Sequence, residues 1–166
     1  TFADVVRQAQ EAGYSEPDPR LDLSGRDVLR KLLILSREAG AAIDEADVEI
    51  DPILGPEFFS GKVPAFYEML AANESSFATA YREAADKGLR QRFVASLVAV
   101  QEEGGVHYKA SMGLQCVGPE NPLFNLCGTD NAALIKTAFY PSPLVVQGAG
   151  AGAYQTASGV LNDILL

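Results

Sequence analysis

The sequence has few residues of the kinds that form metal cages and disulfide frameworks. Its 166 residues include no tryptophan, one histidine (His107) and two cysteines (Cys116 and Cys127). One histidine excludes a metal site built from several histidines, and no Cys-x-x-Cys motif is present. Two cysteines leave a disulfide open, but we expect them to be buried free thiols, as in cytoplasmic proteins. No apolar run approaches the roughly 18–20 residues of a membrane span, and no signal peptide is visible.

Positive charge is also scarce. There are 13 Lys and Arg residues against 22 Asp and Glu residues, which gives a net charge of −9. This balance argues against nucleic-acid binding through phosphate contacts, since that requires clustered basic residues. It does not exclude anionic small molecules, because local fields can oppose the net sign. The length is enough for one domain with a core, and 48% of the residues are hydrophobic.

Apolar spacing predicts helices first and strands later in the chain. The expected helices cover 2–12, 24–39, 64–88 with a break near Asn73, and about 151–165. The expected strands are 47–54, a hairpin of 92–100 and 106–117, and short strands within NPLFNLC, AALIKTAFY and PLVVQ. This order predicts an α+β fold, with helices packed on a largely antiparallel sheet.

One acidic stretch, GYSEPDPRLDLSGRDVLRK (13–31), is the main candidate site. Local rules explain part of it. Ser24 and Asp27 have the spacing of a helix capping box, and Asp27 precedes Lys31 by four residues, as in a surface ion pair. Two prolines, Pro17 and Pro19, stiffen the turn.

Capping leaves Glu16, Asp18 and Asp22 without partners. A Pro-x-Pro frame holds Glu16 and Asp18 extended and can pre-orient carboxylates. Such a pocket suits a substrate with an ammonium group and a reacting oxygen, because a carboxylate binds the ammonium and a lysine protonates a developing alkoxide. A calcium site is a third interpretation, but the EF-hand spacing is absent. The structural and catalytic interpretations both stay open on the residues alone.

A glycine cluster, Gly148, Gly150 and Gly152, lies between a predicted strand and the last predicted helix. The spacing is close to a dinucleotide-binding fingerprint, but no second strand follows to complete a βαβ unit. The glycines either permit a tight turn or let backbone N–H groups approach a ligand held mainly by another segment. His107 has no acid or cysteine at ligand spacing, so we expect a partly exposed strand histidine.

Two long motifs resemble the homoserine dehydrogenase family. The stretch GYSEPDPRLDLSGRDVLRKLLIL (13–35) resembles its substrate-loop signature, and PLVVQGAGAGAYQTASGVLNDIL (143–165) resembles its closing segment. NPLF, Asn131 with the following AL, and the Tyr-Pro-x-Pro-Leu-Val run also fit. The pattern is most similar to the C-terminal part of the version that is fused to aspartokinase. Leu21 departs from it, since the family commonly has an aspartate there, and so do Ser15 and Leu29.

The resemblance implies reduction of L-aspartate 4-semialdehyde to L-homoserine with NADP or NAD as cofactor, in threonine and methionine biosynthesis. It implies that Lys31 donates the proton, that Glu16 holds the substrate ammonium, and that Asp27 contacts substrate or orients the lysine. Asp22 would be a further polar contact. Three glycines would lie near the nicotinamide: Gly13, Gly150 and Gly152. No metal ligand is expected.

The family's Rossmann domain is absent from these residues, and the chain begins at Thr1 without methionine. We therefore expect residues 1–166 to be one substrate-binding and dimerisation region of a longer protein. Its last helix would return to a dinucleotide-binding domain, and its partners would be a small-molecule substrate and further copies of itself. Two alternatives stay open: a non-catalytic dimerisation and substrate-loop module, or another NAD(P)-linked amino-acid reductase.

Overall fold

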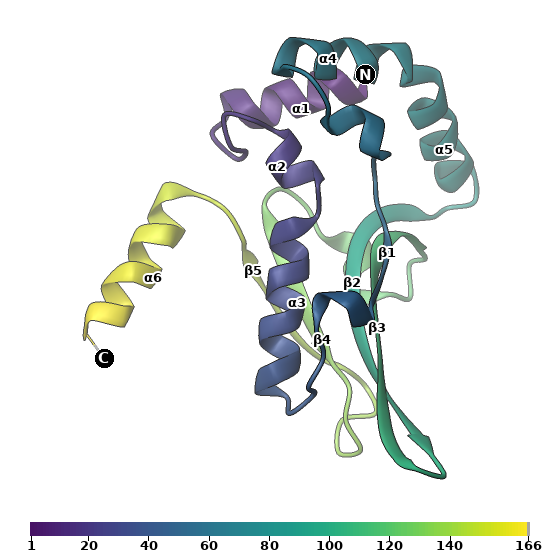
Figure 1. The fold of residues 1–166 in the computed structure, drawn as a ribbon, viewed down its shortest axis with the longest axis vertical. Coiled ribbons are helices and arrows are strands. Elements are labelled where there is room, and N and C mark those ends of the chain that lie inside the picture. Colours follow the sequence, from purple (N-terminus) through teal and green to yellow (C-terminus); the bar gives the residue numbers. More distant parts are fainter. Residues whose placement is uncertain (166) are drawn as a thin grey trace.

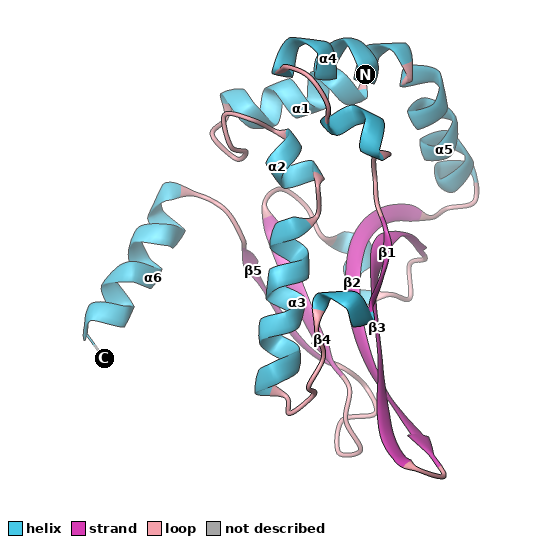
Figure 2. Ribbon diagram, viewed as in Figure 1, coloured by secondary structure: helices cyan, strands magenta, loops and turns pink. Residues whose placement is uncertain are grey.

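The computed structural model describes residues 1–165, which form helices and strands in the order drawn in Figures 1 and 2. The α-helices are α1 (Phe2–Glu11), α2 (Arg20–Leu23), α3 (Arg26–Glu38), α4 (Val63–Ala72), α5 (Glu74–Asp86) and α6 (Ala153–Leu165). The 3-10 helices are η1 (Glu45–Asp47), η2 (Pro56–Phe59) and η3 (Pro122–Asn125). The strands are β1 (Val48–Asp51), β2 (Arg90–Glu102), β3 (Gly105–Val117), β4 (Asp130–Ile135) and β5 (Leu144–Ala149). The α+β prediction is confirmed.

One core lies among the helices at the top of Figure 1. Phe66 and Leu70 of α4 are fully buried there, against apolar residues of α1 and η2. The expected break near Asn73 is confirmed, because this residue alone separates α4 from α5 and its side-chain amide donates to the Met69 carbonyl at 2.9 Å. Because of this break, α4 and α5 point in different directions and both pack on α1, which a single straight helix could not do along its whole length.

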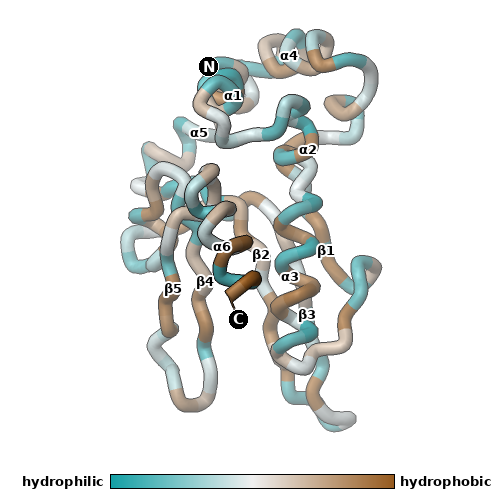
Figure 3. Tube along the Cα trace, turned by 90° about the vertical axis from the view of Figure 1, so that its left-hand side faces the viewer, coloured by the Kyte–Doolittle hydropathy of each residue, from teal (hydrophilic) through white to brown (hydrophobic). Residues whose placement is uncertain are grey.

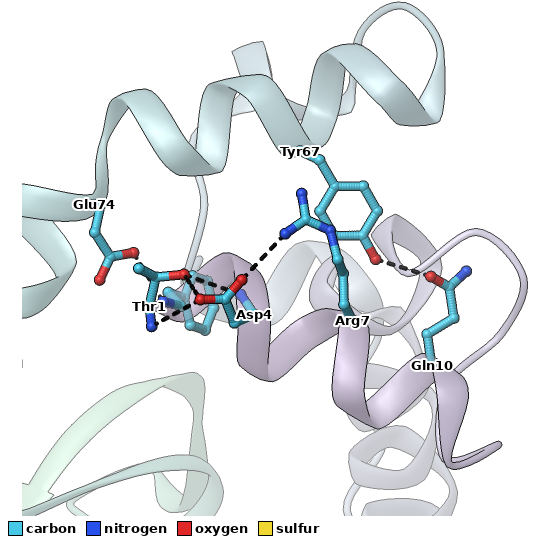
Figure 4. Close-up of polar contacts among 7 residues, drawn as sticks. Thr1, Asp4, Arg7, Gln10, Tyr67 and Glu74 are labelled. Atoms are coloured by element: carbon cyan, nitrogen blue, oxygen red, sulfur yellow. Dashed lines mark hydrogen bonds and ion pairs between the residues drawn. The ribbon is translucent and has the colours of Figure 1, made fainter.

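Polar contacts also join α1 to α4 (Figure 4). The Tyr67 hydroxyl donates to Gln10 Oε1 at 2.9 Å, and the guanidinium of Arg7 lies 4.6 Å from the centre of the Tyr67 ring. Partial burial raises the pKa of Tyr67, so its hydroxyl stays protonated and remains a donor. At the other end of α1, the Phe2 N–H donates to Glu74 at 2.8 Å.

The second core lies between α3 and a three-stranded sheet of order β1-β3-β2. Leu29 and Leu32 lie one turn apart on α3 and pack over Ala110 and Met112 of β3. The predicted β2–β3 hairpin is confirmed, with Glu102 paired with Gly105 at its turn. β1 runs parallel to β3, so the sheet is mixed at this edge.

β4 and β5 form a separate antiparallel pair, from Asp130 opposite Ala149 to Ile135 opposite Leu144. The strand expected in NPLFNLC is wrong, because residues 122–125 form η3, with the Asn121 side chain accepting from the Leu123 N–H. α6 stands apart from the other elements in Figure 1 and has no buried residue. Figure 3 shows apolar residues in β4, β5 and the end of α6.

Two smaller expectations concern single side chains. The prediction of buried thiols is wrong: Cys116 and Cys127 are both exposed and free of disulfides within residues 1–165. His107 is a partly exposed strand residue as expected, and its Nε2 lies 4.0 Å from Glu102 across the hairpin. Among the described residues, no helix combines the length and the apolarity needed to cross a membrane.

Candidate functional site

An open cleft of about 420 Å³ lies between the first half of α3 and the adjoining ends of β4 and β5. One wall comes from α1, the acidic loop and α3: Ala9, Tyr14, Asp22, Asp27 and Lys31. The other comes from the start of β4 and the segment after β5: Gly128, Thr129, Asp130, Asn131, Gly150 and Ala151. A second hollow of about 300 Å³, beside η2, is mostly apolar and contains none of the predicted site residues. The polar cleft is therefore the candidate site.

Lys31 and Asp27 form an ion pair on the α3 wall. Lys31 Nζ lies 2.6 Å from Asp27 Oδ2, one helical turn away, and both side chains are more than half exposed. Because the pair is exposed, its contribution to folding is small. Its effect on the cleft is geometric: Asp27 holds the ammonium of Lys31 against this wall.

The start of α3 corrects the expected capping box. Gly25, with a φ of 72°, takes the N-cap position, where it has no side chain to accept the hydrogen bonds expected of Ser24 and Asp27 in a capping box. Ser24 Oγ instead donates to the Leu21 carbonyl at 2.6 Å and accepts from the Arg26 N–H. A methyl group at Gly25 would lie 2.7 Å from the Met112 side chain, so glycine also lets α3 approach the sheet. Asp27 is thereby left free to pair with Lys31.

The expectation that Asp18 and Asp22 lack partners is wrong. Asp22 Oδ2 accepts the Glu16 N–H at 3.0 Å, which closes the loop back onto α2. Asp18 accepts from Arg20 Nε at 2.8 Å and from Arg20 Nη2 at 2.6 Å. These hydrogen bonds from Arg20 lower the pKa of Asp18, and the same contact raises the pKa of Arg20. Two of the four loop carboxylates therefore shape the loop itself.

The opposite wall is held by contacts with β2. Arg92 donates to the carbonyls of Leu123, Phe124 and Leu126, at 2.7–2.8 Å, and so fixes η3 just before the cleft residues. The Gly150 N–H donates to the Thr129 carbonyl at 2.8 Å. A methyl group at Gly150 would overlap the Asn131 side-chain amide, so this amide covers the glycine directly.

The cleft brings together four of the seven sequence-predicted site residues: Asp22, Asp27, Lys31 and Gly150. Glu16 is exposed outside the lining and is tied to it only through its backbone bond to Asp22. Gly13 and Gly152 also lie outside the lining. Both have positive φ, at the end of α1 and before α6, where the chain turns. The site roles of all seven stay predictions.

Tyr14 and Asn131 line the cleft but received no role from the sequence. Both residues lie within motifs that the sequence shows: Tyr14 is part of the acidic stretch 13–31, and Asn131 is part of the pattern shared with the family. Both side chains are uncharged, whereas charge and glycine spacing are the signals that predict the other site residues. Among residues 1–165, no group of three or more His, Cys, Asp or Glu side chains is arranged to hold a metal ion.

The charges in the cleft favour an amphoteric small molecule. The carboxylates of Asp22 and Asp27 suit an ammonium group, and Lys31 suits an oxygen that gains negative charge. On the opposite wall Gly128 and Gly150 leave backbone that a flat ring can approach, and the Asp130 carboxylate beside them accepts from Gln147 Nε2 at 2.9 Å. The arrangement therefore suits a small molecule that carries an ammonium group and an oxygen that accepts a proton.

Comparison with known proteins gives one consistent family. The homoserine dehydrogenase family model matches residues 1–165. The chain is 40% identical over 168 residues to bifunctional aspartokinase/homoserine dehydrogenase 2 of Arabidopsis thaliana, covering 99% of this chain and 18% of that protein. It is 35% identical over 166 residues to homoserine dehydrogenase of Saccharomyces cerevisiae, covering 99% of this chain and 45% of that protein.

Solved structures agree with this fold. A Candida auris protein of unknown function is 36% identical, with a TM-score of 0.83 over 99% of this chain and 45% of its own. Homoserine dehydrogenase of S. aureus has a TM-score of 0.70 at 24% identity over 99% of this chain and 36% of its own, a likeness in fold alone. The chain thus spans about a fifth of the bifunctional relatives and less than half of the others.

Proposed function

Because this chain belongs to the homoserine dehydrogenase family, we propose that it is the substrate-binding part of a homoserine dehydrogenase. The reaction is the reduction of L-aspartate 4-semialdehyde to L-homoserine with NADPH or NADH. The observation that carries the proposal is the shared cleft, in which Lys31 and Asp27 form one wall with Asp22 while the glycine segment forms the other. An amino-acid aldehyde has the ammonium and the reacting oxygen that these groups suit.

In this proposal Lys31 is the general acid. Its ammonium donates a proton to the aldehyde oxygen as negative charge develops there, which lowers the barrier by acid catalysis and by charge neutralisation. Asp27, 2.6 Å from Lys31 Nζ, orients the ammonium before the substrate arrives. Asp22 and Glu16 bind the substrate ammonium, so the aldehyde carbon is held in one orientation.

The nicotinamide cofactor supplies the hydride when bound. The residues present fit only its nicotinamide end: Gly150 and Ala151 present backbone to the cleft opposite Lys31, and any side chain at Gly150 would displace Asn131. The described residues contain no βαβ unit that would hold a pyrophosphate. Most of the cofactor would therefore be bound by a dinucleotide-binding domain elsewhere in the protein. Which of NADP and NAD is used depends on that domain.

Substitution of Lys31 in the full-length protein tests the proposal. Lys31→Ala should lower kcat by about 10²–10⁴-fold, the usual contribution of a positioned general acid. Arg30→Ala is the matched control, because Arg30 is the neighbouring cation on α3 and does not line the cleft. Glu16→Gln should mainly raise KM for the semialdehyde, since it removes binding present in both ground and transition states. A normal kcat for Lys31→Ala would remove the proposed proton donor.

The non-catalytic alternative is separated by assaying residues 1–166 alone. We expect no oxidation of NADPH with the semialdehyde, because these residues hold only one end of the cofactor. Turnover by this piece would contradict the division of the cofactor site that we propose.

We also propose that the chain self-associates through its sheet. β2 is an edge strand of 13 residues, and Val98 on it is exposed. A long unpaired edge with an exposed apolar residue favours pairing with a second copy. Val98→Lys should weaken the oligomer in analytical ultracentrifugation, whereas Arg82→Glu on α5 should leave its mass unchanged.

A further inference from the structure

Hydrogen bonds outside the cleft connect the acidic loop, residues 13–20, to α1 and α4. The loop is pinned on one side by Gln10, whose Nε2 donates to the Pro17 carbonyl at 2.7 Å. The other end of the same amide, Gln10 Oε1, accepts from the Tyr67 hydroxyl at 2.9 Å. A single glutamine therefore connects α4 to the loop, and Figure 4 shows Tyr67 and Gln10 pointing toward each other from their two helices.

The loop is pinned on its other side by Arg20. Its guanidinium binds both oxygens of Asp18 and also donates from Nη1 to the Gly61 carbonyl at 2.9 Å, just before α4. The Arg20 side chain is only 16% exposed, and Pro19, between the two partners, is fully buried. The planar guanidinium of Arg20 donates to three acceptors and is partly buried. It therefore keeps one orientation, unlike the mobile side chains of an exposed ion pair.

The hydrogen bonds of Gln10 and Arg20 are connected to the cleft through Asp22. The pinned residues 17–20 lie between Glu16 and Asp22, and the Glu16 N–H donates to Asp22 Oδ2 at 3.0 Å. Asp22 lines the cleft, whereas none of Gln10, Asp18, Arg20 and Tyr67 does. A displacement of the loop would therefore shift the two carboxylates proposed to bind the substrate ammonium. Lys31 and Asp27 lie on α3 beyond this loop and would keep their positions.

We propose that Tyr67, Gln10, Asp18 and Arg20 are positioning residues that set the affinity of the cleft for the ammonium end of the substrate. This inference rests on the proposed function and adds residues that never touch the substrate. Loosening the network raises KM for the amino-acid substrate, leaves KM for the nicotinamide cofactor unchanged and changes kcat little, because Lys31 is not moved.

The cleanest variant is Tyr67→Phe in the full-length enzyme, since it removes one hydroxyl and keeps the ring under Arg7. We expect KM for the semialdehyde to rise about fivefold, the value of one neutral hydrogen bond, with kcat within twofold of the original. The matched control is Tyr81→Phe on α5, where the tyrosine is 65% exposed and outside the network. Its KM should not change.

Two further variants show whether the network acts as one unit. Arg20→Lys keeps the charge but loses the bidentate hydrogen bonds to Asp18, and it should raise KM for the semialdehyde by about tenfold or more. Gln10→Ala already breaks the link from Tyr67 to the loop, so adding Tyr67→Phe to it should raise KM no further. If Arg20→Lys does not fold, the tyrosine and glutamine variants still decide the matter.

The outcomes separate this inference from the function on which it rests. Loss of turnover in Lys31→Ala, together with unchanged substrate KM in Tyr67→Phe and Gln10→Ala, would overturn the positioning role alone. Equal rises in KM for substrate and cofactor would also overturn it, because they indicate general loosening of the fold. Normal turnover in Lys31→Ala would overturn the proposed function itself.

Discussion

Gly150→Ala is the sharpest test of the wall opposite Lys31. The added methyl group would overlap the side-chain amide of Asn131, which covers Gly150 and lines the cleft. Gly148, two residues earlier in the same segment, provides a matched control, because a methyl group there meets no other atom within 4 Å. Neither glycine has a positive φ, so alanine fits the backbone at both positions.

The expected changes in stability and activity follow from the displacement of the Asn131 side chain. Asn131 must leave its rotamer, at a cost of about 0.5–1.5 kcal/mol. Replacing glycine by alanine recovers about 0.4–1 kcal/mol by restricting the unfolded chain. The free energy of unfolding should therefore change by less than about 1 kcal/mol. Activity should fall by about tenfold or more, because the displaced amide alters the shape of the cleft at the site proposed for the nicotinamide.

Steady-state kinetics and urea unfolding on the full-length protein measure the two effects separately. Gly148→Ala should be normal in both. In an Asn131→Ala background the amide is already gone, so Gly150→Ala should cause no further loss of activity. If Gly150→Ala and Gly148→Ala had the same kinetics, the close contact between Gly150 and Asn131 would have no part in the reaction, and this reasoning would be refuted.

Three further predictions concern stability. Arg92→Lys should lower the free energy of unfolding by about 2–3 kcal/mol in urea titrations, because it removes most of four hydrogen bonds to carbonyls; Arg82→Lys on α5 should have little effect. Phe66→Ala empties a fully buried position and should cost about 3–5 kcal/mol, well above Phe59→Ala at the partly buried edge of the same core. The hydrogen bonds from Arg20 lower the pKa of folded Asp18 below 3.8, so their stabilisation is complete at higher pH and is lost as the pH falls through the lowered value. Stability measured below about pH 4 should therefore fall less steeply in Asp18→Asn, and an unchanged slope would contradict the assignment.

Local patterns were enough to predict most of the elements. Leu29 and Leu32 recur at helical spacing in a segment that becomes α3, and the alternation on both sides of Gly104 predicts the β2–β3 hairpin. The strand prediction for residues 122–125 is wrong because their apolar side chains resemble those of a strand. The Asn121 side chain accepts from the Leu123 N–H and so begins the 3-10 helix η3. Strand and helical turn are hard to separate when an apolar run is so short.

The contacts that anchor the acidic loop to α4 and to the turn before it could not be predicted, because they join residues that are distant in the sequence. Arg20 reaches the Gly61 carbonyl 41 residues away, and Gln10 meets Tyr67 57 residues away. The Gly150–Asn131 contact depends in the same way on the pairing of β4 with β5. Sequence spacing gives the residue types available to a site, whereas the tertiary fold decides which of them face the same space.

The four acids of the loop show why this distinction matters for function. The sequence has four carboxylates in this stretch and leaves the partners of three of them open, yet Asp18 accepts from Arg20, and one oxygen of Asp22 accepts the Glu16 N–H. Asp22 Oδ1 and the exposed carboxylate of Glu16 are left to bind an ammonium, while Asp27 is paired with Lys31. The acids of this stretch thus differ in their contacts: Asp18 and Asp22 take part in the hydrogen bonds of the loop, Asp27 pairs with Lys31, and Glu16 is exposed. Arg20 and the buried Pro19 fix residues 17–20, and without them a flexible loop would leave Glu16, Asp18 and Asp22 in water and equally available to any cation.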